Sequence, residues 1–305
     1  MQPSKANLSA TYGLLVLIWA STPLAIVWSV QDINLYWALA LRFFIALPLA
    51  AVILYLSRIP FPFNGHALHS YLAGACSFIG SQIFTYMATS YLSSGIIALM
   101  FGLAPIMTGL IGHFVFRVHL RRLQWLGMMI AVCGLGIICL GGSGQHVHPI
   151  GIMLMLLSVL IYCVSIFWIK KVNAPVEPMA QALGSIGISV IFSLCMLPFI
   201  WSEAPAQLPA AKSLFSLLYA SVMASLIAMF CYFKLVRNIQ ASTLSLTTVM
   251  TPILAILIGA LLNNEKLTMM VLFGAAVLLS GLLIYFYQDF RANRKFAHKL
   301  NKPSS

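Results

Sequence analysis

One segment of the chain occurs twice, and this internal repeat restricts the possible folds more than any other feature. Residues 94–137 align without a gap on residues 241–284, at an offset of 147 residues. The alignment pairs Pro105 with Pro252 and keeps an isoleucine, a leucine and three glycines in register after these prolines. This agreement predicts a tandem duplication with two structurally equivalent halves.

Ten apolar runs of about 18 residues or more are each long enough to cross a bilayer as a helix. Charged residues make up 7% of the 305 residues and hydrophobic residues 61%, whereas about a quarter of an ordinary soluble domain is charged. The expected fold is therefore an all-α polytopic membrane protein with ten transmembrane helices as two inverted five-helix repeats. The predicted spans are residues 9–29, 36–56, 69–90, 94–116, 123–141, 150–170, 179–201, 212–234, 239–262 and 268–288.

The repeats must be inverted, because each contains an odd number of spans. We expect the first repeat over residues 1–145, the second over residues 146–290 and a basic cytoplasmic tail over residues 291–305. Inverted repeats can give a protein two nearly equivalent conformations, one open to each side of the membrane, which is the basis of alternating access. The duplication therefore favours a transporter.

The basic residues predict the orientation of the spans. Of the 17 Lys and Arg residues, 14 fall on the side of the N-terminus, while only Lys212 and Lys266 fall in loops on the opposite side. The positive-inside rule then places both termini in the cytoplasm of a multi-pass protein of the cell inner (plasma) membrane. The net charge of +12 reflects this orientation, so no nucleic-acid partner is expected.

The motifs expected of several enzyme and cofactor classes are missing. The chain has no HExxH sequence, no GxxxxGK[ST] loop and no CxxC pair among its six cysteines. An intramembrane enzyme, an ATP-driven pump and a disulfide framework are therefore not expected. His146 and His148 lack a third ligand, so we expect no metal and no cofactor. Because all five acidic residues lie in loops or at span ends, a buried carboxylate relay is not expected either.

The paired prolines are candidate hinges. A proline cannot donate to the carbonyl four residues earlier, so Pro105 leaves the carbonyl of Phe101 free and Pro252 leaves that of Thr248 free. In transporters, matched interruptions in the two halves are a sequence pointer to the substrate site. The alternative is a packing kink that neighbouring side chains relieve.

Arg42 lies inside the second span, where an ionisable residue is a functional hypothesis by default. Its nearest candidate partner in the sequence is Asp32. In one interpretation Arg42 binds a substrate carboxylate or locks the outer gate. In the other, its side chain extends to the membrane interface or bonds carbonyls at helix ends.

Polar and aromatic side chains at mid-depth complete the candidate site. Thr243, Thr247 and Thr251 fall on one stripe of the ninth span, although a threonine in a membrane helix often bonds only its own upstream carbonyl. We interpret Trp168 and Tyr232, near span ends, as interfacial anchors. The candidate substrate-binding residues are Trp19, Thr22, Arg42, Gln82, Tyr86, Phe101, Tyr162, Thr247, Thr248 and Thr251.

Glycines recur every seven residues on the fourth, fifth and tenth predicted spans. Seven residues make nearly two helical turns, so each set lines one helix face and lets another backbone approach closely. This pattern is typical of tight helix packing, or alternatively of a sliding or homodimer surface. The glycines are Gly95, Gly102 and Gly109, Gly127, Gly134 and Gly141, and Gly274 and Gly281.

The combined pattern resembles the EamA-type exporters of the drug/metabolite transporter superfamily. The resemblance implies a bundle in which spans one to four and six to nine surround a central cavity, with spans five and ten at the periphery. Relatives of this type export amino acids, other small metabolites or drugs. The sequence departs from the family at one place. The family usually has an acidic residue after the fourth span, as Glu265 stands after the ninth, but here Val118 and then His119 follow the fourth span. The resemblance is carried by Trp19 and Ala20, by Leu41 to Ala46, by Pro105, Leu120 and Gly127, and by Pro252, Asn264 to Leu267 and Gly274.

Together these features predict a secondary transporter that exports a small amphipathic metabolite, with an amino-acid-like substrate favoured. The alternative is a multidrug or organic-cation exporter of the same fold, and a channel is less favoured. The expected partners are a small-molecule substrate, the lipid bilayer and, as an alternative use of the glycine faces, a second copy of the chain.

Overall fold

The structure is a computed structural model that describes residues 5–141, 147–205, 207–239, 243–244, 246–265 and 268–300. These residues form helices joined by short connections, and within the described ranges the sole β-type pairing is an isolated bridge between Leu92 and Val147. The helices are α1 (Lys5–Ser29), α2 (Leu35–Leu56), α3 (Gly65–Ala75), η1 (Cys76–Ser81), α4 (Gln82–Ala88), α5 (Ser94–Phe101), α6 (Ala104–Phe116), α7 (Arg122–Gly141), α8 (Pro149–Val172), α9 (Pro178–Ile200), η2 (Trp201–Glu203), α10 (Ala211–Tyr219), η3 (Ala220–Ile227), α11 (Ala228–Asn238), α13 (Thr247–Asn263) and α14 (Met269–Leu300).

The helices match the ten predicted spans. Eight helices among the described residues are long and apolar enough to cross a membrane, and α13 is a shorter apolar helix. The third predicted span corresponds to the consecutive segments α3, η1 and α4, which carry more polar residues than the others. The expectation of an all-α polytopic membrane protein is thus confirmed.

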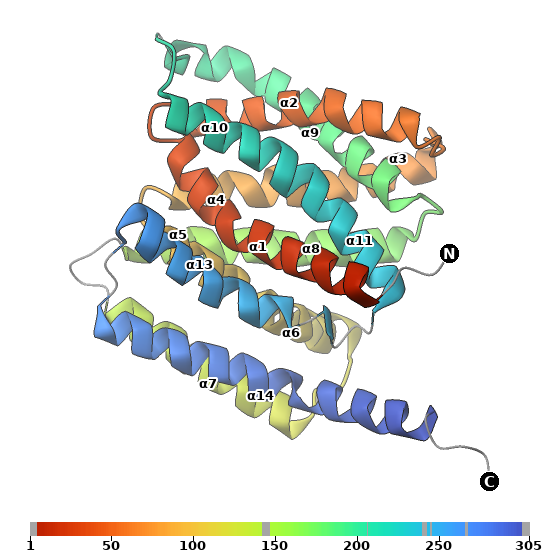
Figure 1. Cartoon of the computed structure of the whole chain (residues 1–305), viewed down its shortest axis with the longest axis vertical. Coiled ribbons are helices and arrows are strands. Elements are labelled where there is room, and N and C mark those ends of the chain that lie inside the picture. The colour runs from red at the N-terminus through yellow and green to blue at the C-terminus, as the bar shows by residue number, and fades with distance from the viewer. Residues whose placement is uncertain are drawn as a thin grey trace.

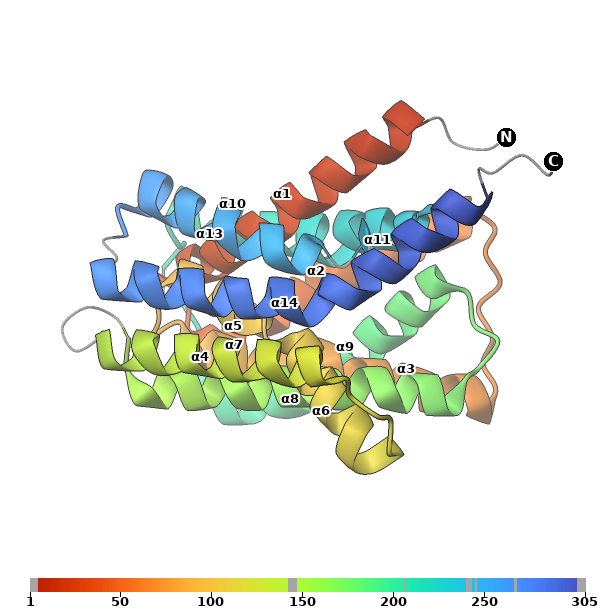
Figure 2. The same cartoon turned by 90° about the horizontal axis from the view of Figure 1, so that it is seen from below.

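The bundle places the start of α1 and the end of α14 at the same end of the molecule (Figures 1 and 2). Helices α2, α9, α10 and α3 lie at one edge of Figure 1, and α7 and α14 pair at the opposite edge. Spans five and ten are therefore peripheral. Helix α14 continues to Leu300, so residues 291–300 of the expected tail extend the last helix, whereas residues 301–305 lie outside the described residues, as does Lys266.

The glycine faces are used for packing inside the chain. A Cβ atom on Gly127 would lie 2.6 Å from the carbonyl oxygen of Gly281, and one on Gly274 would lie 2.9 Å from the carbonyl oxygen of Gly134. The backbones of α7 and α14 therefore touch directly, which larger side chains at these positions would prevent. These contacts support the tight-packing interpretation and leave these glycines buried between two helices of one chain.

The fourth span is broken between α5 and α6. Gly102 and Leu103 form a turn between α5 and α6, and Pro105 is the second residue of α6. In the ninth span a turn at Leu246 precedes α13, which then continues through Pro252 to Asn263. Residues 240–242 and 245 of the predicted ninth span lie outside the described residues. The two candidate hinges therefore differ, and proline alone does not break these helices, because α1, α2 and α9 contain Pro23, Pro48 and Pro198.

The two repeats end their equivalent helices in the same way. Arg117 follows α6 with φ 55°, and Asn264, which is 147 residues further on, follows α13 with φ 50°. Non-glycine residues rarely adopt this left-handed conformation, and its appearance at matched positions fits the duplication. The C-terminal end of α13 meets the N-terminal end of α5 through Glu265 and Ser94. Gly95 faces Ile256 and Gly102 faces Pro252, so α5 of the fourth span and α13 of the ninth run antiparallel. Equivalent spans of inverted repeats are expected to run in opposite directions.

Candidate functional site

Arg42 is buried in the bundle, with 6% of its surface exposed. Its Nε donates a hydrogen bond to Oγ of Ser225 at 3.1 Å, and its Nη1 donates to Oε1 of Gln82 at 3.2 Å. The partner suggested by the sequence was wrong, since Asp32 accepts a hydrogen bond from Oγ of Ser213 at 2.6 Å. Arg42 therefore connects α2 to the third and eighth spans and is held by two neutral groups.

Both partners of Arg42 belong to irregular parts of their helices. Gln82 directly follows the π-helical segment η1, and Ser225 lies within the π-helical segment η3. At the repeat offset, residues 76–81 correspond to residues 223–228, which overlap η3. A π-helical turn widens the helix locally and is frequent at functional sites. Neither π-helical segment could be predicted from the sequence, because their residues keep the apolar character of the flanking helices.

Four aromatic side chains meet as two pairs inside the bundle. The rings of Trp19 on α1 and Tyr232 on α11 lie 5.6 Å apart, and those of Phe101 on α5 and Tyr162 on α8 lie 6.3 Å apart in an edge-to-face arrangement. All four side chains are half-buried. Tyr232 therefore packs against a candidate site residue, which the interpretation as an interfacial anchor did not anticipate.

The candidate threonines differ in what their hydroxyls do. The Oγ1 atoms of Thr22 and Thr247 donate to the carbonyls of Ile18 and Leu244 at 2.6 and 2.7 Å, so each hydroxyl bonds a carbonyl three or four residues upstream. Thr247 is also 2% exposed, so it faces packed neighbours and not an open space. This is the local bonding that threonines in membrane helices often make.

Two candidate hydroxyls are buried without a hydrogen-bond partner among the described residues. They belong to Thr251 on α13 and Tyr86 on α4. Thr251 is half-buried and lies one turn from Thr248, which is half-buried as well. Tyr86 is completely buried in an apolar cluster. In this conformation Tyr86 is therefore part of the protein core.

A polar contact network holds the third span against the sixth. Oγ of Ser158 on α8 lies 2.9 Å from Oγ of Ser81 and 2.8 Å from Oγ1 of Thr85, and it also donates to the carbonyl of Ser81. All three side chains are completely buried. These mid-depth hydroxyls therefore join two helices.

Glu265 joins the C-terminal end of the ninth span to the N-terminal end of the fourth span. Its Oε1 accepts hydrogen bonds from Oγ of Ser94 at 2.8 Å, from the backbone N–H of Ser94 at 3.2 Å and from Nδ2 of Asn263 at 3.0 Å. The carboxylate thereby caps the N-terminus of α5, where free amides and the helix dipole favour a negative charge. Val118, the equivalent residue of the first repeat, has no side-chain acceptor for such a contact.

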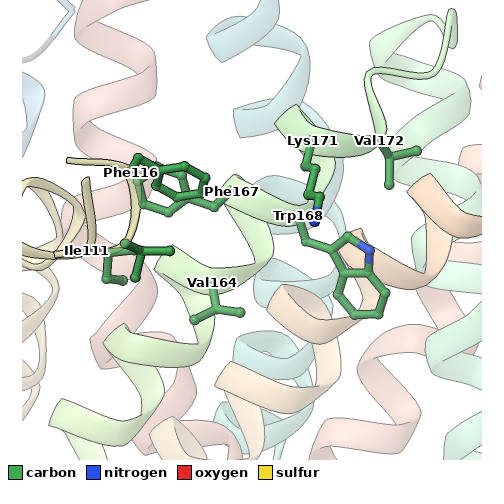
Figure 3. Close-up of a pocket in the computed structure, with 8 residues that line it drawn as sticks. Ile111, Phe116, Val164, Phe167, Trp168, Lys171 and Val172 are labelled. Atoms are coloured by element: carbon green, nitrogen blue, oxygen red, sulfur yellow. The ribbon is translucent and has the colours of Figure 1, made fainter. Parts of the chain in front are cut away.

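The structure thus brings Arg42 and Gln82 together and pairs Phe101 with Tyr162, while Tyr86 and Thr247 are packed away. No group of three His, Cys, Asp or Glu side chains within the described ranges could hold a metal ion. A groove of about 550 Å³ lies between α6 and α8 (Figure 3), and none of the ten candidate residues lines it.

Comparisons with known proteins agree with this architecture. The chain matches the EamA-like transporter family over residues 10–140 and again over residues 149–287. It is 25% identical over 255 residues to the Escherichia coli (strain K12) protein named uncharacterized inner membrane transporter YedA, which covers 83% of this chain and 82% of that protein. An uncharacterized transporter of Buchnera aphidicola subsp. Schizaphis graminum is 25% identical over 291 residues, covering 91% and 95% of the two chains.

Protein PagO of Salmonella typhimurium is 25% identical over 259 residues, which cover 83% of this chain and 84% of that protein. A solved crystal structure superimposes on 95% of this chain and 99% of its own chain with a TM-score of 0.63. Because the sequence identity in that superposition is 17%, the likeness concerns the fold alone.

Proposed function

The chain belongs to the EamA-like transporter family, and from this premise we propose that it exports a small amino-acid-like metabolite by alternating access. We propose that this membrane is the inner membrane, because the Escherichia coli relative is named as an inner membrane transporter. The 14 basic residues on the side of the N-terminus support cytoplasmic termini.

The charge of Arg42 is the observation that carries this proposal. Its guanidinium is buried, and both of its hydrogen-bond partners, Gln82 and Ser225, are neutral. A buried charge is costly unless it is paired. A substrate carboxylate would supply the missing negative charge, and guanidinium and carboxylate groups form strong, oriented hydrogen bonds.

The aromatic pairs supply the remainder of the proposed site. Ser225 and Tyr232 are seven residues apart on one helical span, so they fall on nearly the same face about two turns apart. Tyr232 contacts Trp19. Rings at this position can cover an apolar side chain or face an ammonium group through a cation–π contact. A carboxylate at Arg42 and a side-chain ammonium or apolar group at the rings would describe an amino-acid-like molecule.

The half-exposed rings also favour the second candidate, an exporter of organic cations. Aromatic faces bind quaternary and primary ammonium groups without any carboxylate. In that case Arg42 would have a structural role, connecting α2 to the π-helical segments.

The thermal stability of the purified protein distinguishes the two functions. The protein is heated with amino acids, polyamines, nucleosides or cationic drugs, and the variant Arg42→Ala is measured beside it. A ligand at a hundred times its dissociation constant stabilises the folded state by about 2.7 kcal/mol. If ligands with a carboxylate stabilise the wild type but not the variant, the proposal is supported. Equal stabilisation of both proteins by cations alone favours the second function.

The matched control is Arg122→Ala, which removes one positive charge from an exposed residue at the start of α7. This variant should respond to ligands as the wild type does. Arg42→Gln provides a further test if Arg42→Ala is poorly folded, because glutamine keeps hydrogen-bond donors toward α4 and η3 but carries no charge. A carboxylate ligand that stabilises Arg42→Gln as strongly as the wild type would overturn the assignment.

A further inference from the structure

The groove between α6 and α8 opens where these two helices diverge. Figure 2 shows α6 turning away from α8 toward its C-terminal end, after the break that precedes it. The stacked rings of Phe116 and Phe167, 4.8 Å apart, join the two helices across the groove. The groove encloses about 550 Å³, and its lining consists of Ile111, Val115 and Phe116 from α6 and Val164, Phe167, Trp168, Lys171 and Val172 from α8 (Figure 3).

The groove continues the surface of α8 that faces hydrocarbon. Exposed apolar residues follow one another along α8 at intervals of three or four residues, which is the spacing of one helix face. From Val164, the same spacing leads to Phe167, Trp168 and Lys171, all of which line the groove. The groove is therefore open to the bilayer and separate from the region of Arg42. The exposed residues before it are Ile150, Met153, Leu157, Leu160 and Val164.

The end of the groove carries a positive charge. Lys171 lies in the last turn of α8, and Figure 3 shows its side chain beside Trp168 on the wall of the groove. Trp and Lys side chains are typical of the level at which a membrane meets water. Arg117, which follows the groove residue Phe116 at the end of α6, adds positive charge to this region. Within the described part of the chain, no ion pair engages Lys171.

An apolar trough with an ammonium group at its interfacial end matches one chemical class, a phospholipid with a negative headgroup. We propose that this groove binds an anionic phospholipid of the cytoplasmic leaflet, with an acyl chain along Val164 and Phe167 and the phosphate at Lys171. Basic pockets between transmembrane helices on the cytoplasmic side bind lipids of this kind. The leaflet rests on the orientation given under the proposed function, whereas the site itself does not. A bound lipid would fix α6 relative to α8 on the far side of the break.

Native mass spectrometry of the purified protein in detergent tests the proposal without reference to transport. Phosphatidylglycerol and phosphatidylcholine with the same acyl chains are titrated against the wild type, Lys171→Gln and Lys170→Gln. Lys170 is the matched control, because it is an exposed neighbour that does not line the groove. Lys171→Gln should weaken phosphatidylglycerol binding about fivefold, equivalent to about 1 kcal/mol for one lysine near the membrane surface. Lys170→Gln should leave it unchanged.

Two further outcomes would overturn the proposal. Equal binding of both lipids to the wild type would mean that the groove takes acyl chains without selecting a headgroup. Equal weakening by both lysine variants would mean that charge at the end of α8 acts without a defined site. The variant Val164→Trp, which fills the groove, should reduce binding of phosphatidylglycerol while ligand stabilisation that depends on Arg42 persists. Failure of the lipid site is thereby distinguished from failure of the proposed function.

Discussion

The contact between α7 and α14 allows a sharp test of the architecture through the substitution Gly127→Ala. The added Cβ would lie 2.6 Å from the carbonyl oxygen of Gly281, 2.6 Å from the backbone nitrogen of Tyr285 and 3.0 Å from its Cα. These are backbone atoms, so no rotamer change can move them. The helices must separate by about 0.8 Å before the contact reaches the ordinary range of 3.4 Å and above.

Overpacking of this kind lowers the free energy of unfolding by about 1–3 kcal/mol. The higher helix propensity of alanine relative to glycine raises it by about 1 kcal/mol. Gly136→Ala is the matched control, because it lies on the same helix and a Cβ there meets no atom within 4 Å. It gains the same helix preference without the clash. Gly127→Ala should therefore be less stable than Gly136→Ala by about 1–3 kcal/mol.

The assay is reversible unfolding of both variants in mixed detergent micelles, with the loss of helical structure followed spectroscopically. The difference between the two variants isolates the steric term, since the helix preference cancels. If Gly127→Ala unfolds at the same fraction of denaturing detergent as Gly136→Ala, or at a higher one, the backbones of α7 and α14 do not touch at Gly127.

Three further substitutions test other parts of the structure. Glu265→Ala removes the acceptor at the N-terminus of α5 and should lower the free energy of unfolding by about 1 kcal/mol; unchanged thermal stability would contradict the capping contact. Ser158→Ala breaks hydrogen bonds between buried helices and should destabilise by about 1–2 kcal/mol, whereas exposed Ser280→Ala should have little effect. Trp19→Ala should weaken stabilisation by any transported ligand, and the same ligand response as the wild type would remove Trp19 from the site.

Much of the architecture followed from the sequence, because it depends on the hydrophobicity of each residue and on the chain's own duplication. The span count, the all-helical fold and the peripheral position of spans five and ten, implied by the family resemblance, agree with the structure. The paired prolines stand at different places in their helices. Pro105 follows a break at Gly102 and Leu103, while Pro252 lies within a continuous helix. Pro252 removes a backbone hydrogen bond inside α13, whereas Pro105 stands in the first turn of α6, where its missing N–H would have had no acceptor within the helix. Helices α1, α2 and α9 also continue through a proline, so the packing around each proline decides whether the helix separates.

The candidate site, like the fold, could be predicted from the sequence only in part. Apolar length and the distribution of positive charge identify a multi-pass membrane protein and single out Arg42 as an unusual residue, because the transfer of each residue to hydrocarbon is a local property. The partners of Arg42 are 40 and 183 positions away in the chain. Which side chains meet at such separations depends on helix crossing, on helix rotation and on two π-helical turns. None of these can be read from the hydrophobic pattern, so only the tertiary structure decided that Gln82 and Ser225, and not Asp32, hold the guanidinium.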